Sequence, residues 1–311
     1  LLYKGVDVYR STGYYQNFSD AHNLMSYRHT RAHNSLLVNG IGQPYSTEGY
    51  GSVMRAMGGQ HISYCLGDAS HAYRSISNDP MWVDYFKQAG IEQTPENGFG
   101  ATPLTKYRRH VLMLHPHTVI VYDELEASEA VRWEWLLHSP TEFKIDAVKK
   151  TLSTDNKTKG WVAVTQLFGG HVFTLSQTDR FVVPPAITGA EYPNQWHLTA
   201  RVDGCSATRF LAIIQVGDEA VSIINRDGDT FNVGDWTIKA VLDASKAPEL
   251  TVSHRTEQAV FSYGTDNPAL NGNFYSRQYT GSSLLYDEID GAYQVVEMTD
   301  RSPISTRVVN Q

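Results

Sequence analysis

Hydrophobic residues along the chain form many short runs that predict β-strands. Within each run the apolar residues are either continuous or alternate with polar ones, as in strands buried on both faces or on one face. The runs are Ser35–Val38, Val111–Leu114, Thr118–Tyr122, Trp133–Leu137, Trp161–Leu167, His171–Ser176, Phe210–Val216, Val221–Ile224, Trp236–Leu242, Ala259–Tyr263 and Tyr293–Met298. One segment, Pro80–Ala89, has aromatic residues at helical spacing and predicts a helix. The pattern therefore predicts an all-β fold in which antiparallel strands form a large stacked-sheet sandwich.

Turn-forming dipeptides separate these runs and predict hairpins. The pairs are Asp203-Gly204, Asp227-Gly228, Asn271-Gly272 and Asp290-Gly291. The polar stretch Ser153–Gly160 is either a linker or an exposed hairpin loop, and we favour the hairpin loop. We expect two parts: residues 1–152 hold the central sheets of the sandwich and a candidate active-site loop, and residues 153–311 hold the remaining sheets.

Charge and composition narrow the function classes. The chain of 311 residues has a net charge of −7, which argues against a general nucleic-acid binder, because such domains are basic. It has no apolar run of about 18 residues, so no membrane span is predicted. The two cysteines, Cys65 and Cys205, either form a disulfide or remain thiols. The chain begins at Leu1 without an initiator methionine or a signal peptide, and we interpret this start as a cut in a longer protein or as a processed end.

The segment from Tyr27 to Gln43 carries the strongest functional signal. Its first eight residues contain a phenol, two imidazoles, two guanidinium groups and a carboxamide, and a Gly-x-Gly-Gln turn closes the following apolar run. Tyrosine, histidine and asparagine are suited to removing a proton from a carbon beside a carboxylate without a cofactor. Arginine suits an anionic substrate. The alternative interpretation is a solvated basic loop before a strand.

A series of motifs extends from this segment in both directions. They are Ser11-Thr12-Gly13-Tyr14-Tyr15, a loop with His22, the Tyr27–Gln43 block, Gly67–Tyr73, Arg109–Leu114, Val119–Leu125 and Trp135-Leu136-Leu137-His138. In this order the motifs resemble the C-terminal β-sandwich of heparinase II/III-like polysaccharide lyases, which include heparin, heparan sulfate and alginate lyases. The family's N-terminal α/α toroid is absent from this chain, because no part of it is helical enough to form one.

The resemblance implies cleavage of a uronic-acid-containing glycan by β-elimination. In that reaction the uronate carboxylate is neutralised, a tyrosine or histidine removes the C5 proton, and a tyrosine protonates the departing oxygen. Each proton transfer contributes roughly 10²–10⁴-fold. Because the toroid supplies part of this machinery, we expect the isolated chain to be weakly active or inactive. A periplasmic or secreted location is implied as well. The alternative is a non-catalytic carbohydrate-binding or structural sandwich.

The same resemblance assigns roles to individual residues. Tyr27 stands where these lyases place a tyrosine of the active-site loop and is the first catalytic candidate, followed by His29 and His33. The candidates for binding an anionic polysaccharide are His22, Arg28, Arg31, Asn34 and Gln43. Side-chain alternation implies that only one of the two arginines faces the cleft. Asn34 and Gln43 can instead fix turns, and the two loop histidines at 22 and 29 can be simply exposed.

A metal is a separate question. In several relatives the histidine at the position of His33 helps to bind a structural zinc, which needs three or four ligands. Ser11 stands where the relatives have an aspartate, and their His-x-His element would lie upstream of Leu1. These departures argue against zinc, and without it His33 is expected to be a hydrogen-bonded histidine under the loop. The elimination itself requires no cofactor.

Overall fold

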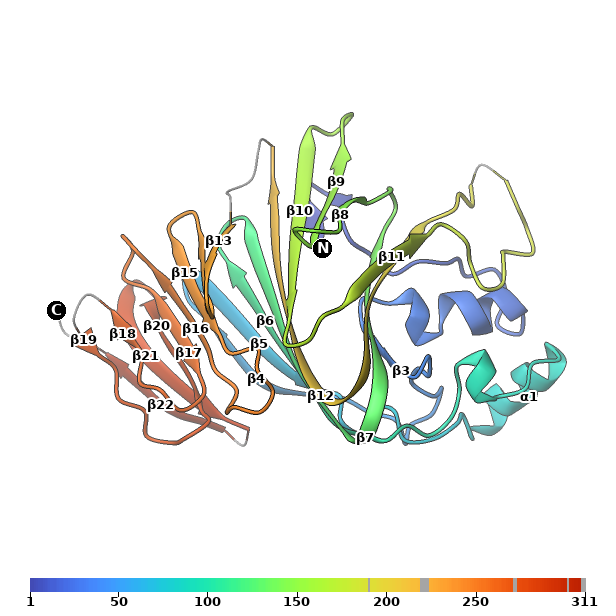
Figure 1. Ribbon diagram of the computed structural model, residues 1–311, viewed down its shortest axis with the longest axis horizontal. Coiled ribbons are helices and arrows are strands. Elements are labelled where there is room, and N and C mark those ends of the chain that lie inside the picture. Colours follow the sequence, from blue (N-terminus) through green and yellow to red (C-terminus); the bar gives the residue numbers. More distant parts are fainter. Residues whose placement is uncertain (190, 219–223, 271–272, 301, 309–311) are drawn as a thin grey trace.

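Two large antiparallel sheets and a small helical region make up the fold (Figure 1). The computed structural model describes residues 1–311 except 190, 219–223, 271–272, 301 and 309–311. The strands are β1 (Leu2–Tyr3), β2 (Val6–Asp7), β3 (Leu36–Val38), β4 (Ser52–Gly58), β5 (Ile62–Asp68), β6 (Leu104–Leu114), β7 (Thr118–Ser139), β8 (Lys144–Asp146), β9 (Thr151–Asn156), β10 (Trp161–Gly169), β11 (Thr174–Thr178), β12 (Trp196–Gly217), β13 (Ile224–Asp227), β14 (Thr230–Val233), β15 (Trp236–Ala240), β16 (Leu250–His254), β17 (Val260–Tyr263), β18 (Ala269–Leu270), β19 (Asn273–Phe274), β20 (Ser283–Ile289), β21 (Ala292–Thr299) and β22 (Ser302–Val308). The helical elements are η1 (Asn23–Tyr27), η2 (Thr30–Ala32), α1 (Pro80–Gln88) and η3 (Pro95–Asn97). The predicted all-β class is confirmed.

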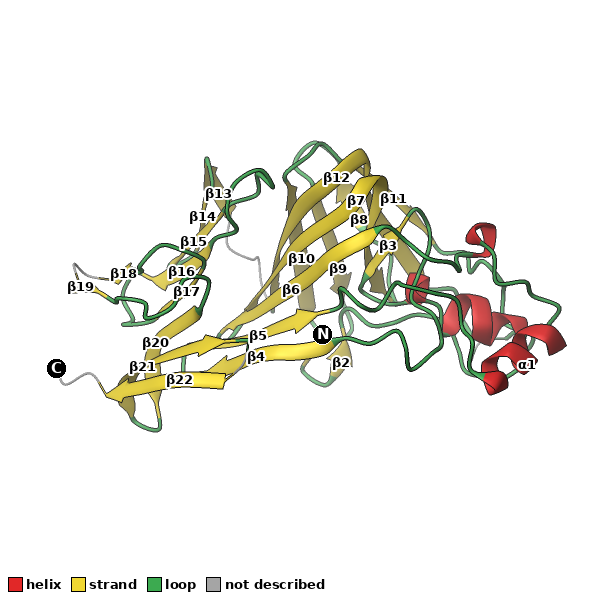
Figure 2. Cartoon of the chain, turned by 90° about the horizontal axis from the view of Figure 1, so that it is seen from below, coloured by secondary structure: helices red, strands yellow, loops and turns green. Residues whose placement is uncertain are grey.

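The first sheet has ten strands and is organised around two very long ones. Its order is β4-β5-β6-β7-β12-β10-β9-β8, with β3 paired to β7 and β11 paired to β12. Strands β7 and β12 are 22 residues long each and pair with one another in antiparallel fashion. Figure 2 shows the helices at one end of the molecule and the second sheet at the other. The long strands therefore connect the helical end to the packing surface between the sheets.

The second sheet has eight strands, in the order β13-β14-β15-β16-β17-β20-β21-β22. The change from one sheet to the other falls between Gly217, where β12 ends, and Ile224, where β13 begins. Residues 153–217 thus continue the sheet that precedes them. The boundary expected at residue 152 does not coincide with the change of sheet.

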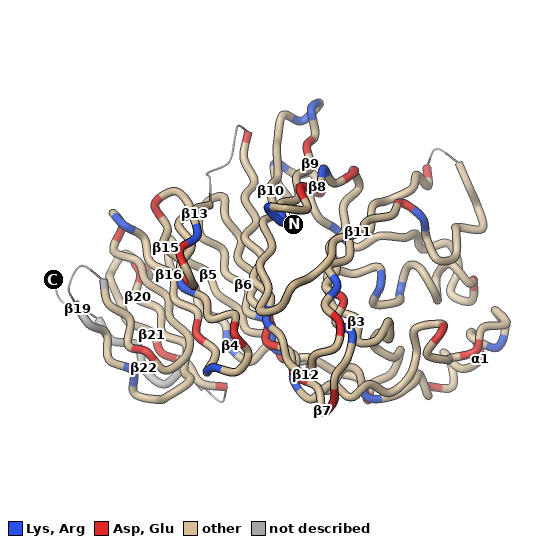
Figure 3. Tube along the Cα trace, in the orientation of Figure 1, with Lys and Arg blue, Asp and Glu red and all other residues tan. Residues whose placement is uncertain are grey.

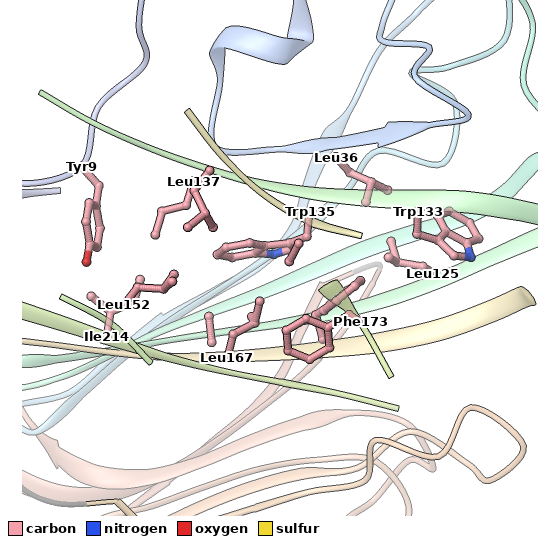
Figure 4. Packing of buried hydrophobic residues seen from close by; sticks show 14 of the residues in the cluster. Tyr9, Leu36, Leu125, Trp133, Trp135, Leu137, Leu152, Leu167, Phe173 and Ile214 are labelled. Carbon is pink, nitrogen blue, oxygen red and sulfur yellow. The ribbon is translucent and has the colours of Figure 1, made fainter. Parts of the chain in front are cut away.

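Two large apolar cores stabilise this arrangement. The first is enclosed by the curled half of the first sheet, where Trp133, Trp135 and Leu137 of β7 pack with Leu167 of β10 (Figure 4). The second lies between the sheets and includes fully buried side chains from both: Leu112, Ile120, Phe231 and Phe261. Burial of each such side chain contributes roughly 1.5–3 kcal/mol, so the sheet interface is a major source of stability.

The predicted helix is confirmed as α1, and its sequence explains its start. The side chain of Asp79 accepts a hydrogen bond from the backbone N–H of Met81 at 3.0 Å, and Pro80 occupies the first helical position. Phe86 of α1 packs in a third, small core with Leu24 and Phe99. Among the described elements, α1 is the longest helix, with nine residues. The contact with Leu24 places α1 beside the segment that carries the candidate site.

Some of the predicted hairpin turns are found in the structure, and one is not. Asp227-Gly228 and Asp290-Gly291 are hairpin turns, and Ser153–Gly160 belongs to the hairpin between β9 and β10. Asp203-Gly204 is not a hairpin: it lies inside β12, at a register shift against β7, because the strand pairs with β7 on both sides of it. Asn271-Gly272 lies outside the described residues, as does the run Val221–Ile224 except for its last residue.

Two further findings concern the cysteines and the predicted absence of a membrane span. Both cysteines, Cys65 and Cys205, are free thiols. Within the described part of the chain, no helix has the length and apolar character needed to cross a membrane.

Candidate functional site

Residues 22–34 contribute side chains to two different cavities. One cavity, of about 600 Å³, is lined by Tyr27, Arg28 and His33, and we call it the Tyr27 cavity. The second, of about 570 Å³, is lined by Ser26 and Arg31, and we call it the Arg31 cavity. The structure therefore brings three of the predicted site residues together and places the two arginines of the motif in separate cavities.

A glycine of the Gly-Tyr-Tyr motif explains how this segment is held. Gly13 has a φ of +84°, which favours glycine. A Cβ atom at this position would lie 2.7 Å from the carbonyl oxygen of Ser26 and 2.8 Å from the Cα of Tyr27. Gly13 thus allows close backbone contact with η1, a single π-helical turn that ends at Tyr27. This contact fixes where the Tyr27 side chain begins.

The cation of the Tyr27 cavity is held by aromatic rings. The guanidinium carbon of Arg28 lies 5.1 Å from the ring centre of Phe18 and 5.0 Å from that of Trp82, which is a cation–π arrangement. Among the described residues no carboxylate forms an ion pair with Arg28, and its Nε atom is buried without a hydrogen-bond partner. Asp79 also lines the cavity, at the start of α1. Arg28 is thus positioned and available to an anion.

His33 is a neutral, hydrogen-bonded histidine. Its Nε2 atom lies 3.3 Å from the carbonyl oxygen of Arg28, and its Nδ1 atom lies 2.8 Å from Oγ of Ser11. Burial lowers the pKa of His33, so Nε2–H donates to the carbonyl and Nδ1 accepts from the hydroxyl. Among the described residues, no group of three or more His, Cys, Asp or Glu side chains is placed to hold a metal. Within the described residues, the partners of His33 are thus the Ser11 hydroxyl and the Arg28 carbonyl.

His29 is not among the residues that line either cavity. It is fully buried, its Nε2 lies 3.0 Å from the carbonyl oxygen of Gly98, and its Nδ1 accepts hydrogen bonds from the backbone N and the Nε of Arg31 at 3.1 and 3.0 Å. Burial and the charge of Arg31 lower the pKa of His29 to about 3. Both ring nitrogens are occupied, so His29 positions Arg31 and has no free access to substrate.

His22 is also buried and binds backbone groups only. Its Nε2 accepts from the backbone N–H of Tyr14 at 3.0 Å, and its Nδ1 donates to the carbonyl oxygen of Val183 at 2.6 Å. Ser26 and Val183 exchange a further pair of hydrogen bonds, both 2.9 Å long. His22 therefore fastens the connection between β11 and β12 to the candidate loop and is not among the residues that line either cavity.

Asn34 and Gln43 make hydrogen bonds within the protein, Asn34 to strand β7 and Gln43 to the loop. The Oδ1 atom of Asn34 lies 2.8 Å from the backbone nitrogen and 3.0 Å from the Nδ1 of His138. The backbone N–H of Gln43 donates to the Oγ1 atom of Thr30 at 2.8 Å. A Cβ at Gly42 would lie 2.7 Å from that threonine, so the glycine lets the turn pack against the loop.

Sequence reasoning missed the residues that complete both cavities. Trp82 and Tyr45 line the Tyr27 cavity, and Arg132, Arg180 and His197 line the Arg31 cavity. The helix containing Trp82 was predicted, but no local pattern indicates that it packs beside Arg28. The convergence of these residues is a property of the tertiary fold.

Comparisons with known proteins agree with this fold. A family model described as "Heparinase II/III-like, C-terminal" matches residues 1–200, and the chain belongs to this family. Among solved structures, a heparinase III with methylated lysines matches at 13% identity over 81% of this chain and 33% of that one, with a TM-score of 0.54. Heparan sulfate lyase HepC from Pedobacter heparinus matches at 11% identity over 78% and 33%, with a TM-score of 0.49. The chain spans about a third of the length of these structures. No match was found among curated proteins.

Proposed function

We propose that this chain is the β-sandwich part of a polysaccharide lyase that cleaves a uronic-acid-containing glycan by β-elimination. Membership of the heparinase II/III-like family supports the class. The observation that carries the proposal is the Tyr27 cavity, where a phenol, a guanidinium with no carboxylate partner among the described residues and a neutral imidazole line one space. These are the groups that an elimination beside a carboxylate needs.

The chemistry divides between these three side chains. The guanidinium of Arg28 binds the uronate carboxylate and stabilises the negative charge that develops when the C5 proton leaves. Tyr27 transfers a proton, either from C5 or to the departing glycosidic oxygen. His33 is the second candidate base, because its Nδ1 atom is an acceptor that only the Ser11 hydroxyl occupies. Loss of the C5 proton forms the C4=C5 double bond while the bond from C4 to the glycosidic oxygen breaks.

The remaining machinery is proposed to come from outside this chain. Because the chain spans about a third of the heparinase structures it matches, an N-terminal α/α toroid is the proposed partner of the Tyr27 cavity. A second tyrosine would come from it, together with a further group that acts with Arg28 on the carboxylate. We place the enzyme in the periplasm or outside the cell, where a polymeric substrate is met.

A non-catalytic carbohydrate-binding sandwich is the second candidate. It is favoured by one observation, namely that Ser11 bonds to His33 at the position where the relatives are expected to have an aspartate. A chain that keeps the family shape and binds glycan without cleaving it would show this kind of change.

An elimination assay separates the two functions. The 311-residue chain, and the longer protein that carries a toroid ahead of it, are incubated with heparan sulfate and with alginate, and ultraviolet absorbance of the unsaturated product is followed. We expect product from the longer protein and little or none from the chain alone. Glycan binding by the longer protein without any product would favour the binding domain instead.

A further inference from the structure

The Arg31 cavity is lined by other residues of the candidate loop than the Tyr27 cavity and has no role in the proposed elimination. Its lining comes from widely separated parts of the chain: the loop, the turn after β3, strand β7, the end of β11 and strand β12. We propose that this cavity is a second binding site, for a carboxylate- or sulfate-bearing sugar unit. The choice of an acidic glycan as its ligand rests on the proposed function, while the site itself rests on the geometry below.

Arg31 is a largely buried cation without an acidic partner. Its guanidinium donates to the Nδ1 of His29 at 3.0 Å and to the carbonyl oxygen of Asn97 at 2.7 Å, and both groups are neutral. No described residue places a carboxylate within ion-pair distance of it. Burial lowers the pKa of Arg31. Buried arginines are ordinarily paired with acids, so an anion in the cavity would supply the missing charge.

Two more arginines line the same space, and acidic side chains lie near them: Glu96 lines the cavity, and the charge of Glu134 acts on Arg31. Arg132 lies 3.3 Å from Glu134 and is partly exposed, whereas Arg180 is exposed and has no ion-pair partner within the described part of the chain. The one lining carboxylate belongs to Glu96. In Figure 3, basic and acidic positions lie together beside β3 and beyond the end of β11. Among the described lining residues, Arg31 and Arg180 therefore remain without an ion-pair partner, which suits the cavity to an anion although the whole chain is acidic.

The rest of the lining suits a sugar. Leu37, Leu136 and Phe181 provide an apolar surface, and Thr199 and His197 provide polar atoms. An apolar surface with a few polar groups is the usual composition of a small-molecule site. Nε2 of His197 has no hydrogen-bond partner among the described residues, and burial lowers the pKa of this histidine to about 4. Its neutral ring adds no charge to that of the arginines.

The segment beyond β11, which lines the cavity, is anchored. Besides the two bonds between Ser26 and Val183, Gln16 exchanges two hydrogen bonds with the backbone of Ile187, at 2.8 and 3.2 Å. Pro193 accepts a hydrogen bond from the hydroxyl of Tyr14 at 2.5 Å. Because several bonds fix this connection, little ordering is required of it when a ligand binds.

Binding is tested by calorimetry on the 311-residue chain. The probes are a heparin tetrasaccharide, an unsulfated glucuronate-containing tetrasaccharide and inorganic sulfate. Arg180→Ala removes an exposed side chain that the fold does not need, and Arg132→Gln is the second variant. Each is expected to weaken tetrasaccharide binding about tenfold, which corresponds to about 1.4 kcal/mol. Preference for the sulfated probe would identify sulfate as the recognised group, and equal binding would identify the carboxylate.

The Arg28→Ala variant separates this proposal from the proposed function. Weaker binding in Arg28→Ala together with native affinity in Arg180→Ala and Arg132→Gln would overturn the second site and leave the Tyr27 cavity in place. Weaker binding in the Arg180 and Arg132 variants would support the second site whatever Arg28→Ala does. Absence of binding by the native chain would also overturn it, whereas the elimination assay on the longer protein judges the proposed function independently.

Discussion

Two polar clusters in this molecule use the same kinds of side chains and differ in how completely they are paired. The first lies between the two sheets and is buried. Arg55 donates to Oγ of Ser283 at 2.9 Å, Ser283 donates to the hydroxyl of Tyr64 at 3.0 Å, and that hydroxyl lies 3.0 Å from Nδ1 of His110. Every donor in this series meets an acceptor on the next side chain.

The series continues to a buried carboxylate. Nε2 of His110 lies 2.9 Å from Oε1 of Glu124, and the hydroxyl of Tyr263 donates to the same oxygen at 2.8 Å. Lys106 Nζ lies 2.7 Å from the other oxygen. Burial alone would raise the pKa of Glu124. Hydrogen bonds and charge interactions with His110 and Lys106 outweigh burial and lower this pKa to about 2. The cluster links β4, β5, β6 and β7 to β17 and β20.

In the second cluster, on residues 22–34, the histidines are paired but the arginines are not paired with described carboxylates. His29 and His33 have partners for both ring nitrogens, but no described carboxylate pairs with Arg28 or Arg31. Arg28 lines the Tyr27 cavity, and Arg31 lines the Arg31 cavity. Buried polar groups that pair with one another stabilise the fold. Cations that line a cavity without an acidic partner indicate a binding site for an anion.

The largest expected effect tests the open cluster. In the longer lyase, Tyr27→Phe should lower turnover by roughly 10²–10⁴-fold, because only the proton-transferring hydroxyl is lost. Stability should be unchanged. The matched control is Tyr15→Phe, since the Tyr15 ring lies 6.2 Å from that of Tyr27 and does not line the cavity. Equal turnover in the native protein and in Tyr27→Phe would remove this residue from the mechanism.

The closed cluster is tested by Glu124→Ala. The change leaves His110 and Tyr263 without their shared acceptor and should lower the free energy of unfolding by about 3–5 kcal/mol. Glu126→Ala is the control: this residue contacts the same lysine at 3.2 Å from the same strand but is half exposed, and it should cost less than about 1 kcal/mol. Chemical denaturation measures both. Similar losses in the two variants would show that the cluster has no special stabilising role.

Acidification should affect His29 and Glu124 in different pH windows. The pKa of His29 is about 3 in the folded chain against an ordinary 6.5. Below pH 6.5 the unfolded chain binds a proton that the folded chain does not, so stability falls by up to roughly 1.4 kcal/mol per pH unit down to pH 3. Glu124, with its pKa depressed to about 2, loses its contribution only as the pH falls from 4.5 through 2.

Denaturation at pH 7 and pH 5 isolates the histidine. His29→Gln keeps an acceptor for Arg31 and a donor for Gly98, so its stability should drop by roughly 2 kcal/mol less than that of the native chain between these two pH values. Identical drops would show that His29 does not control this window.

The smallest effect concerns binding. Arg28→Ala should weaken binding of an anionic tetrasaccharide to the chain about tenfold, and added salt should reduce the native affinity. Lys149, which is exposed and remote from both cavities, provides the control Lys149→Ala. If both variants bind as tightly as the native chain, Arg28 is a structural cation held by Phe18 and Trp82.

The strands could be predicted from sequence because alternation reports burial directly. Strand β7 shows the limit of this method, since two separate runs were predicted where one strand continues from Thr118 to Ser139. Between the runs lies Glu126–Ala130, which is polar and largely exposed, opposite the irregular part of β12. Pairing with a neighbouring strand keeps this stretch extended, and pairing cannot be seen in a local pattern.

Only the site residues that belong to the Tyr27–Gln43 motif could be predicted from the sequence. The motif placed Tyr27, Arg28 and His33 close together, and the structure brings all three to one cavity. It did not indicate that His29 is buried against Gly98, because that depends on a segment far along the chain. The distribution of the two arginines between cavities follows from the short helical turns η1 and η2, for which the sequence offers no clear signal.

The length of β12 has a practical consequence for protein expression. The family match ends at residue 200, within this strand. A recombinant fragment cut there would lose Phe210–Gly217, the part that pairs with β10, and the exposed backbone edges would promote aggregation. A cut after Gly217 would keep the strand but uncover Leu112 and Ile120, which the second sheet buries. We therefore expect soluble material only from fragments that include both sheets.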